Sequence, residues 1–211
     1  NAIENWWKPA PDHDDVWGWG QVSGVAVDNP NRIVVGVWGD RDEQNRERVG
    51  SSNYLVVVDG EGNITENWSQ WDSLFNKPHQ IYISPYDPER HVWVVERGLG
   101  INDVNMQILK FTNDGSELVM QLVDPAHPRT RAEARANTEP GPYTYGDPAV
   151  LAFFPNGDFL LGDGYWNSRI VRYNAKGDFL MEFGELGDGP GQFDLVHGVA
   201  IDRNRRIYVG D

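Results

Sequence analysis

The chain has 211 residues, of which 39% are hydrophobic and 24% are charged, so it can fold around a hydrophobic core as an ordinary globular domain. Its 32 acidic and 18 basic residues give a net charge of −14, which would repel nucleic acid phosphates and anionic lipid surfaces alike. It contains no cysteine, which excludes disulfides, thiolate metal ligands and cysteine nucleophiles. No apolar run reaches the roughly 18 residues of a membrane-spanning helix. From the charge and the lack of such a run, we expect neither nucleic acid nor a membrane as a partner.

The predicted secondary structure is a series of short strands. The chain has 23 glycines, 13 prolines and many short β-branched runs, which favour an all-β fold. In chain order, four segments share one layout, which is a strand, a polar turn and a second strand. These pairs are 24–28 with 32–35, 79–83 with 91–96, 149–153 with 159–163, and 197–202 with 206–211. After each of the first three pairs comes another pair around a glycine turn, and the first strands of these are 54–58, 107–111 and 170–173. Each unit is therefore predicted to be a four-stranded antiparallel sheet.

A repeated four-stranded unit of about 40 to 50 residues is typical of a β-propeller blade, because one such sheet cannot bury both of its faces alone. Equivalent positions in the four units are 56, 70 and 48 residues apart. The two longer spacings contain inserts at 41–52 and 124–145, which are loops of the kind that line a binding face. We therefore expect a β-propeller with about four blades in this chain.

The fourth unit stops after two strands at Asp211, which leaves an open sheet edge. We therefore expect the chain to continue, and a closed ring of six blades would need on the order of 100 more residues. Residues 1–20 are expected to form an N-terminal extension, and residues 21–211 the blades.

Two of the five histidines occupy the same register in alternate units. His79 and His197 each begin the first strand of a unit, and in a propeller this strand is the innermost one. In a six-bladed ring, a third histidine two blades further on would complete a three-histidine site with an open position, as in catalytic zinc sites. The alternative is that each imidazole only satisfies a local hydrogen bond. His13, His91 and His127 show no such relation and are expected at the surface or in loops.

Other chemical motifs are weaker. Asp40 and Asp163 end inner strands and could neighbour a metal, but they are predicted to be acids that cap turns. The glycines at 187, 189 and 191 neither follow a strand into a helix nor end in Lys-Ser or Lys-Thr. They therefore predict a loop between blades and not a phosphate site.

Several strings in the chain carry a family resemblance. They are Gly-Asp-Gly-Tyr-Trp-Asn-Ser-Arg at 162–169, Gly-Pro-Gly-Gln-Phe at 189–193, Ile-Tyr-Val-Gly-Asp at 207–211, Gly-Gln-Val-Ser-Gly-Val-Ala-Val-Asp at 20–28 and Pro78-His79. Together they resemble NHL-repeat propellers, and within that group the chain is similar to peptidyl-α-hydroxyglycine α-amidating lyase. The resemblance extends from about residue 17 to residue 211 and is densest after Gly146.

The resemblance implies a metal site and a catalytic base. In that family three histidines in the central channel hold a zinc ion, and His79 and His197 match two of them, while the third would lie beyond Asp211. The family's tyrosine, proposed as the base, matches Tyr165, for which the alternative is an aromatic packing residue in a tight turn. A structural calcium is held there by backbone carbonyls that match Val25 and Ile81, together with an aspartate next to the third histidine.

Two departures weaken the transfer of the family's chemistry. The family's substrate-binding arginine falls on Trp38, and an indole cannot supply the forked donors that bind a carboxylate. Arg41 or Arg97 could reach the channel in its place, although each is more typical of a solvated loop charge. The half-cystine beside the family's tyrosine is Trp166 here.

The sequence therefore predicts a zinc-dependent, lyase-like propeller, with calcium as a second ion, that cleaves the C–N bond of an α-hydroxylated amide or peptidyl-hydroxyglycine. One alternative keeps the metal and performs hydrolysis on an apolar or aromatic substrate, because Trp38 replaces the arginine. The other is a non-catalytic NHL module that binds a protein or glycan through exposed tryptophans. A small molecule or peptide is the expected substrate, and secretion or a periplasmic location is slightly favoured.

Overall fold

The computed structural model describes residues 6–8, 17–18, 21–38, 41–42, 53–98, 105–125, 136 and 139–211. Within them the chain forms three antiparallel sheets of four strands, a pair of strands at the C-terminal end, and a short pairing of β1 (Trp17–Gly18) with β4 (Arg41–Asp42). A 3₁₀-helix, η1 (Ser69–Leu74), precedes the second sheet. No helix in this described part is both long and apolar enough to span a membrane.

The strands of each sheet follow one another in chain order. The first sheet contains β2 (Val22–Asn29), β3 (Arg32–Val37), β5 (Leu55–Val58) and β6 (Ile64–Asn67). The second contains β7 (Pro78–Ile83), β8 (Val92–Glu96), β9 (Gln107–Phe111) and β10 (Leu118–Leu122). The third contains β11 (Val150–Phe153), β12 (Phe159–Asp163), β13 (Arg169–Tyr173) and β14 (Phe179–Phe183), and the last pair is β15 (Gly198–Ile201) with β16 (Ile207–Gly210). The predicted all-β repeat is confirmed, with strand bounds shifted by at most two residues.

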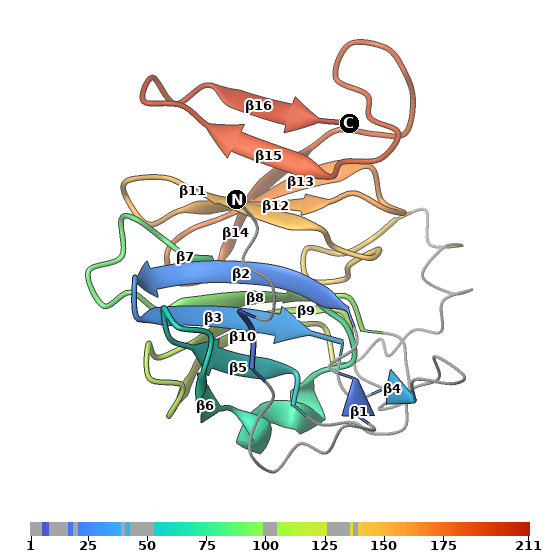
Figure 1. Ribbon diagram of the computed structural model, residues 1–211. Helices are drawn as coiled ribbons and strands as arrows, with labels where there is room; N and C mark the ends of the chain where they lie inside the picture. The colour runs from blue at the N-terminus through green and yellow to red at the C-terminus, as the bar shows by residue number, and fades with distance from the viewer. Residues whose placement is uncertain are drawn as a thin grey trace.

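The sheets stack face to face in sequence order, from the blue first sheet to the red β15–β16 pair (Figure 1). Successive side chains of a strand point to opposite faces, so each inner strand serves two interfaces. In β8, Val92 and Val94 pack against the first sheet, whereas Trp93 and Val95 pack against the third. This is the packing of propeller blades, and the described sheets form an open arc and not a closed ring.

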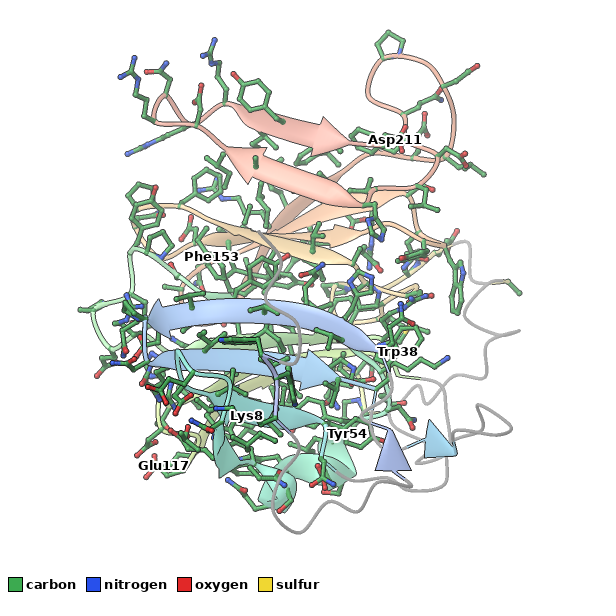
Figure 2. All side chains as sticks on the ribbon, viewed as in Figure 1. Lys8, Trp38, Tyr54, Glu117, Phe153 and Asp211 are labelled. Carbon is green, nitrogen blue, oxygen red and sulfur yellow. The ribbon has the colours of Figure 1, made fainter. Side chains whose placement is uncertain are left out.

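The first strands of neighbouring sheets lie beside one another, since β2 contacts β7, β7 contacts β11, and β11 contacts β15. We call the end at which these strands begin the histidine end, because His79 and His197 lie there; Trp38 marks it in Figure 2. The opposite end carries the β7–β8, β11–β12 and β15–β16 turns and is called the hairpin end; Phe153 marks it in Figure 2.

Asp and Asn side chains close the turns at the hairpin end. In the β5–β6 turn, Asp59 Oδ1 accepts hydrogen bonds from the backbone N–H groups of Glu61 and Asn63, both at 2.9 Å. Gly115 in the β9–β10 turn has a φ of 70°, and a Cβ at this position would lie 2.2 Å from the Trp68 ring. Glycine is therefore required there both by the backbone and by the packing.

The outer face of the first sheet is covered by the segment Trp6–Lys8. Trp6 and Trp7 pack against the buried valines of β3 and β5. The Trp6 indole Nε1 donates to the Gly60 carbonyl at 3.0 Å, and Lys8 N–H donates to the Gly62 carbonyl at 2.9 Å. Part of the predicted N-terminal extension thus takes the place that a neighbouring blade would occupy against this face.

Candidate functional site

Three side chains predicted to act together meet at the histidine end. His79 is the second residue of β7, His197 directly precedes β15, and Tyr165 lies in the turn after β12. The ring centroids of His79 and His197 are 5.3 Å apart. The Tyr165 hydroxyl lies 2.6 Å from His197 Nε2 and 3.3 Å from His79 Nε2. Two imidazole nitrogens and one phenol oxygen from three different sheets therefore converge on one point.

His79 is held as a neutral ring with a defined tautomer. Its Nδ1 lies 2.8 Å from the Ala149 carbonyl, and because a carbonyl only accepts, Nδ1 carries the hydrogen. Nε2 is then left with a lone pair that faces Tyr165 and His197. Burial, followed by the positive charge of Arg97, lowers the pKa of His79 to about 4. A carbonyl that fixes one nitrogen while the other points into the site is the usual support of a metal-binding histidine.

The Tyr165 turn is held in place by close backbone contacts. A Cβ on Gly164 would lie 1.9 Å from the Val196 carbonyl oxygen, so glycine lets this turn approach the residue before His197. The Trp166 N–H donates to the Gly146 carbonyl at 3.0 Å. The absence of a side chain at 164 is therefore what brings the phenol within reach of the second imidazole.

Asp163, the last residue of β12, holds the same turn through hydrogen bonds. It is completely buried, and it accepts hydrogen bonds from Gly146 N–H at 2.7 Å, Asn167 Nδ2 at 2.6 Å and Arg169 Nε at 3.0 Å. The Asp163–Arg169 ion pair is itself buried, and Arg169 also donates to the carbonyls of Pro140, Gly141 and Thr144. Asp163 caps the turn as expected, and its partner Arg169 connects the second insert to the third sheet.

Arg97 packs against the ring of Tyr165, and two of its guanidinium nitrogens are bound to Asp147. The guanidinium carbon is 4.3 Å from the centroid of the Tyr165 ring. The side chain forms a two-point ion pair with Asp147, through Nε and Nη2. Burial raises the pKa of Tyr165, and the Arg97 charge opposes that rise. With Nε and Nη2 bound to Asp147, the Arg97 guanidinium is fixed against the Tyr165 ring.

Trp38 flanks the site from the end of the first sheet. Its indole Nε1 donates to the carbonyl of Pro78, the residue before His79, at 3.2 Å. The Lys77 ammonium lies 5.5 Å from the centroid of the Trp38 ring. Completely buried Glu96 accepts from the Lys77 N–H at 2.8 Å and so fixes the entry into β7. Trp38, with the Lys77 ammonium beside its ring, thus occupies the position at which the family resemblance implies an arginine.

The remaining predicted site residues are placed as follows. Val25 and Ile81 lie on the adjacent strands β2 and β7, where a Cβ on Gly24 would be 2.6 Å from the Ile81 nitrogen, so the two backbones approach closely. Arg41 lies in β4, where it pairs with Gly18, and its side chain lies outside the described residues. His13 and His127 lie outside the described residues.

His91 precedes β8 as a loop residue but is buried, not at the surface. Its Nδ1 lies 2.8 Å from the Asp87 carboxylate, and Glu89 is the third member of a possible metal-binding group in the described residues. The Lys110 ammonium lies 3.7 Å from the same carboxylate. Because a cation already stands there and Asp87 also accepts from the Glu89 and His91 N–H groups, this cluster is a hydrogen-bonded turn.

Reasoning from the sequence did not find Lys77, Glu96 or Asp147. The signal for Glu96 was present, since Glu96 is the last residue of the fully buried strand β8, in the repeat that contains His79. Asp147 has a positive φ of 64° just after the second insert, where the repeat provides no register. Its pairing with Arg97 joins residues 50 positions apart and depends on the stacking of the sheets.

No protein-family model matches the sequence. NHL repeat-containing protein 3 of Homo sapiens is 27% identical over 190 residues, which cover 89% of this chain and 48% of that protein. Peptidyl-alpha-hydroxyglycine alpha-amidating lyase 1 of Drosophila melanogaster is 26% identical over 182 residues, covering 79% of this chain and 29% of that protein. The curated relatives thus include NHL repeat-containing proteins and peptidyl-alpha-hydroxyglycine alpha-amidating lyases. This confirms the resemblance carried by the sequence strings.

A third relative and one solved structure complete the comparison. Peptidylglycine alpha-amidating monooxygenase of Rattus norvegicus is 26% identical over 226 residues, covering 92% of this chain and 21% of that protein. A structural genomics protein of unknown function from Bacteroides thetaiotaomicron has a TM-score of 0.54 at 11% identity, covering 91% of this chain and 45% of that chain, which supports the fold alone. The chain thus spans less than half the length of these relatives.

Proposed function

We propose that this chain carries two metal ligands and the proton acceptor of an amidating-lyase-like site, which cleaves the C–N bond of an α-hydroxylated amide. The observation that supports the proposal is the convergence of His79 Nε2 and His197 Nε2 on the Tyr165 hydroxyl. Relatives named as amidating lyases match most of the chain, which supports the same chemistry.

The donor set fits a zinc ion in part. His79 presents an unprotonated Nε2, because its Nδ1–H donates a hydrogen bond to the Ala149 carbonyl and the pKa of the ring is lowered to about 4. His197 presents Nε2 to the same point, so two imidazole nitrogens are available to a metal ion. Lewis-acid polarisation of the substrate hydroxyl is the chemistry that zinc supplies when it is bound.

The chain's own residues then account for the proton transfers. Tyr165 accepts the proton of the substrate hydroxyl, the oxygen forms a carbonyl with its carbon, and the bond from that carbon to the amide nitrogen breaks. The nitrogen takes a proton back, so the products are a primary amide and an aldehyde acid such as glyoxylate, with no net oxidation. Tyr165 accepts the proton as its phenolate, and the Arg97 charge, with its guanidinium carbon 4.3 Å from the ring centroid, favours that ionised form.

A hydrolase on an aromatic or apolar substrate is the second candidate, and one observation favours it. Trp38 is anchored beside His79 through Pro78 and leaves no arginine at the position where the family binds its substrate. A non-catalytic NHL binding module is the third candidate, since the relatives include NHL repeat proteins whose names carry no activity.

Turnover of a peptidyl-α-hydroxyglycine separates these candidates. We expect the purified protein to release glyoxylate, and the variant Tyr165→Phe to lose this activity by a factor of about 10² to 10⁴ while it keeps its metal, because general base catalysis is of that size. Tyr208→Phe, an exposed tyrosine on β16, is the matched control and should be unaffected. If the protein hydrolyses an apolar or aromatic substrate and releases no glyoxylate, the result would support the hydrolase. If the protein binds no zinc and turns over no substrate, the result would support the binding module.

A further inference from the structure

A hollow lined by two arginines lies at the hairpin end, away from the histidine cluster. It has a volume of about 170 Å³ and lies between the third sheet and the β15–β16 pair. Its lining residues are Phe154, Pro155, Asn156, Arg172, Arg205 and Ile207. Phe153, the neighbour of Phe154, marks this end of the molecule in Figure 2, opposite Trp38.

Arg172 is held in a fixed position within the hollow. It lies on β13, its Nη2 donates to Asp158 Oδ2 at 2.6 Å, and its guanidinium carbon is 4.7 Å from the centroid of the Phe154 ring. Its Nε is buried and has no hydrogen-bond partner in the described part of the chain. The carboxylate of Asp158 and the ring of Phe154 therefore orient the guanidinium, and its Nε–H makes no hydrogen bond in the described residues.

Arg205 adds a second positive charge from the opposite wall. It lies in the β15–β16 turn, where its backbone has a φ of 63° and its N–H donates to the Asp202 carbonyl at 2.9 Å. The Asp202 carboxylate is occupied by the Arg206 side chain at 2.7 Å. Two arginines thus line the hollow, and the carboxylate paired with Arg172 is that of Asp158, in a chain whose net charge is −14.

Size and lining define what the hollow can accept. A cavity of about 150 Å³ lined by apolar side chains is large enough to hold benzene, so a volume of about 170 Å³ accommodates one six-membered ring with a small substituent. Phe154 and Ile207 supply apolar walls for the ring. Guanidinium groups bind carboxylates through paired, charge-assisted hydrogen bonds.

We propose that this hollow is a binding site for a small aromatic carboxylate of about the size of benzoate. The ring packs between Phe154 and Ile207, and the carboxylate is bound by Arg172 and Arg205. The site is separate from the histidine cluster and does not depend on the lyase proposal, because it uses none of the same residues.

The test is a titration of the protein with sodium benzoate, followed by amide NMR at Asn156, Gly157 and Ile207. We expect saturable shifts confined to the two turns and β16, weaker binding of acetate, which lacks the ring, and no saturable binding of benzyl alcohol, which lacks the charge. Arg205→Gln should weaken benzoate binding about tenfold, because one charge-assisted contact is lost.

Arg203→Gln is the matched control, since it removes the same charge from the same turn outside the lining, and it should leave benzoate affinity unchanged. Arg205→Gly keeps the test independent of folding, because the φ of 63° at position 205 suits glycine. This variant should keep the melting temperature of the wild type but bind benzoate more weakly. Equal losses in Arg203→Gln and Arg205→Gln, or benzyl alcohol binding as well as benzoate, would overturn the proposal.

Discussion

At the hairpin end, the turns are closed by residues that are neighbours in the sequence, whereas at the histidine end the contacts join residues that lie far apart. Asp59 closes its turn with Asn63, four positions away. His79 reaches Tyr165 across 86 positions, and Tyr165 reaches His197 across 32. Local hydrogen bonds therefore close the turns at one end, and the stacking of whole sheets assembles the candidate site at the other.

This contrast makes the histidine end the more sensitive to single changes. A turn closed by its own neighbours can be repaired locally, because water or an adjacent residue replaces the lost partner. A cluster assembled from three sheets depends on the buried groups that fix each of its turns. The following changes test this difference, from the largest expected effect to the smallest.

Removing the carboxylate below the Tyr165 turn should have the largest effect on stability. Asp163→Ala leaves Arg169, which is 3% exposed, with only the more exposed Glu182 as an ion-pair partner, and we expect a loss of about 3 kcal/mol in the free energy of unfolding. Urea denaturation measures the change. Asp202→Ala, which removes an aspartate that closes an exposed turn at the hairpin end, should cost much less. Equal costs would contradict the contrast between the two ends.

Acid should destabilise the metal-free protein through His79. The pKa of this imidazole is lowered from 6.5 to about 4, mainly by burial, so between these values the unfolded chain binds a proton that the folded chain does not. The free energy of unfolding should therefore fall by up to about 3 kcal/mol as the pH drops from 6.5 to 4. Urea denaturation at pH 7 and pH 4.5 measures this loss, and His79→Gln should lose less over the same interval. An identical pH dependence in wild type and variant would show that His79 is not responsible.

A side chain at position 164 should push the Tyr165 turn away from His197. A Cβ there would lie 1.9 Å from the Val196 carbonyl, so Gly164→Ala should cost about 1–3 kcal/mol and lower any turnover. Gly198→Ala is the control, because the nearest atom to its Cβ would be 3.7 Å away. Thermal unfolding compares the two variants. If Gly164→Ala were no less stable than Gly198→Ala, the close approach would not be essential.

The same contrast explains what could be predicted from the sequence. The repeat of short strands and polar turns is local, so it gave the sheets, their order and the shared register of His79 and His197. Tyr165 was placed through the strings that resemble amidating lyases. Asp147 and Lys77 were missed, because their roles follow from a backbone with positive φ after an insert and from an indole on another sheet, neither of which leaves a periodic signal.

The central claim is that His79 and His197 bind one metal ion together, and metal analysis of single variants tests it most directly. After incubation with zinc and gel filtration, the wild-type protein should retain about one zinc per chain, as expected for a single histidine site. His79→Ala and His197→Ala should each lose it without unfolding, whereas His91→Gln, at the Asp87 turn, should keep it. Zinc retained at the wild-type level in both His79→Ala and His197→Ala would contradict the account.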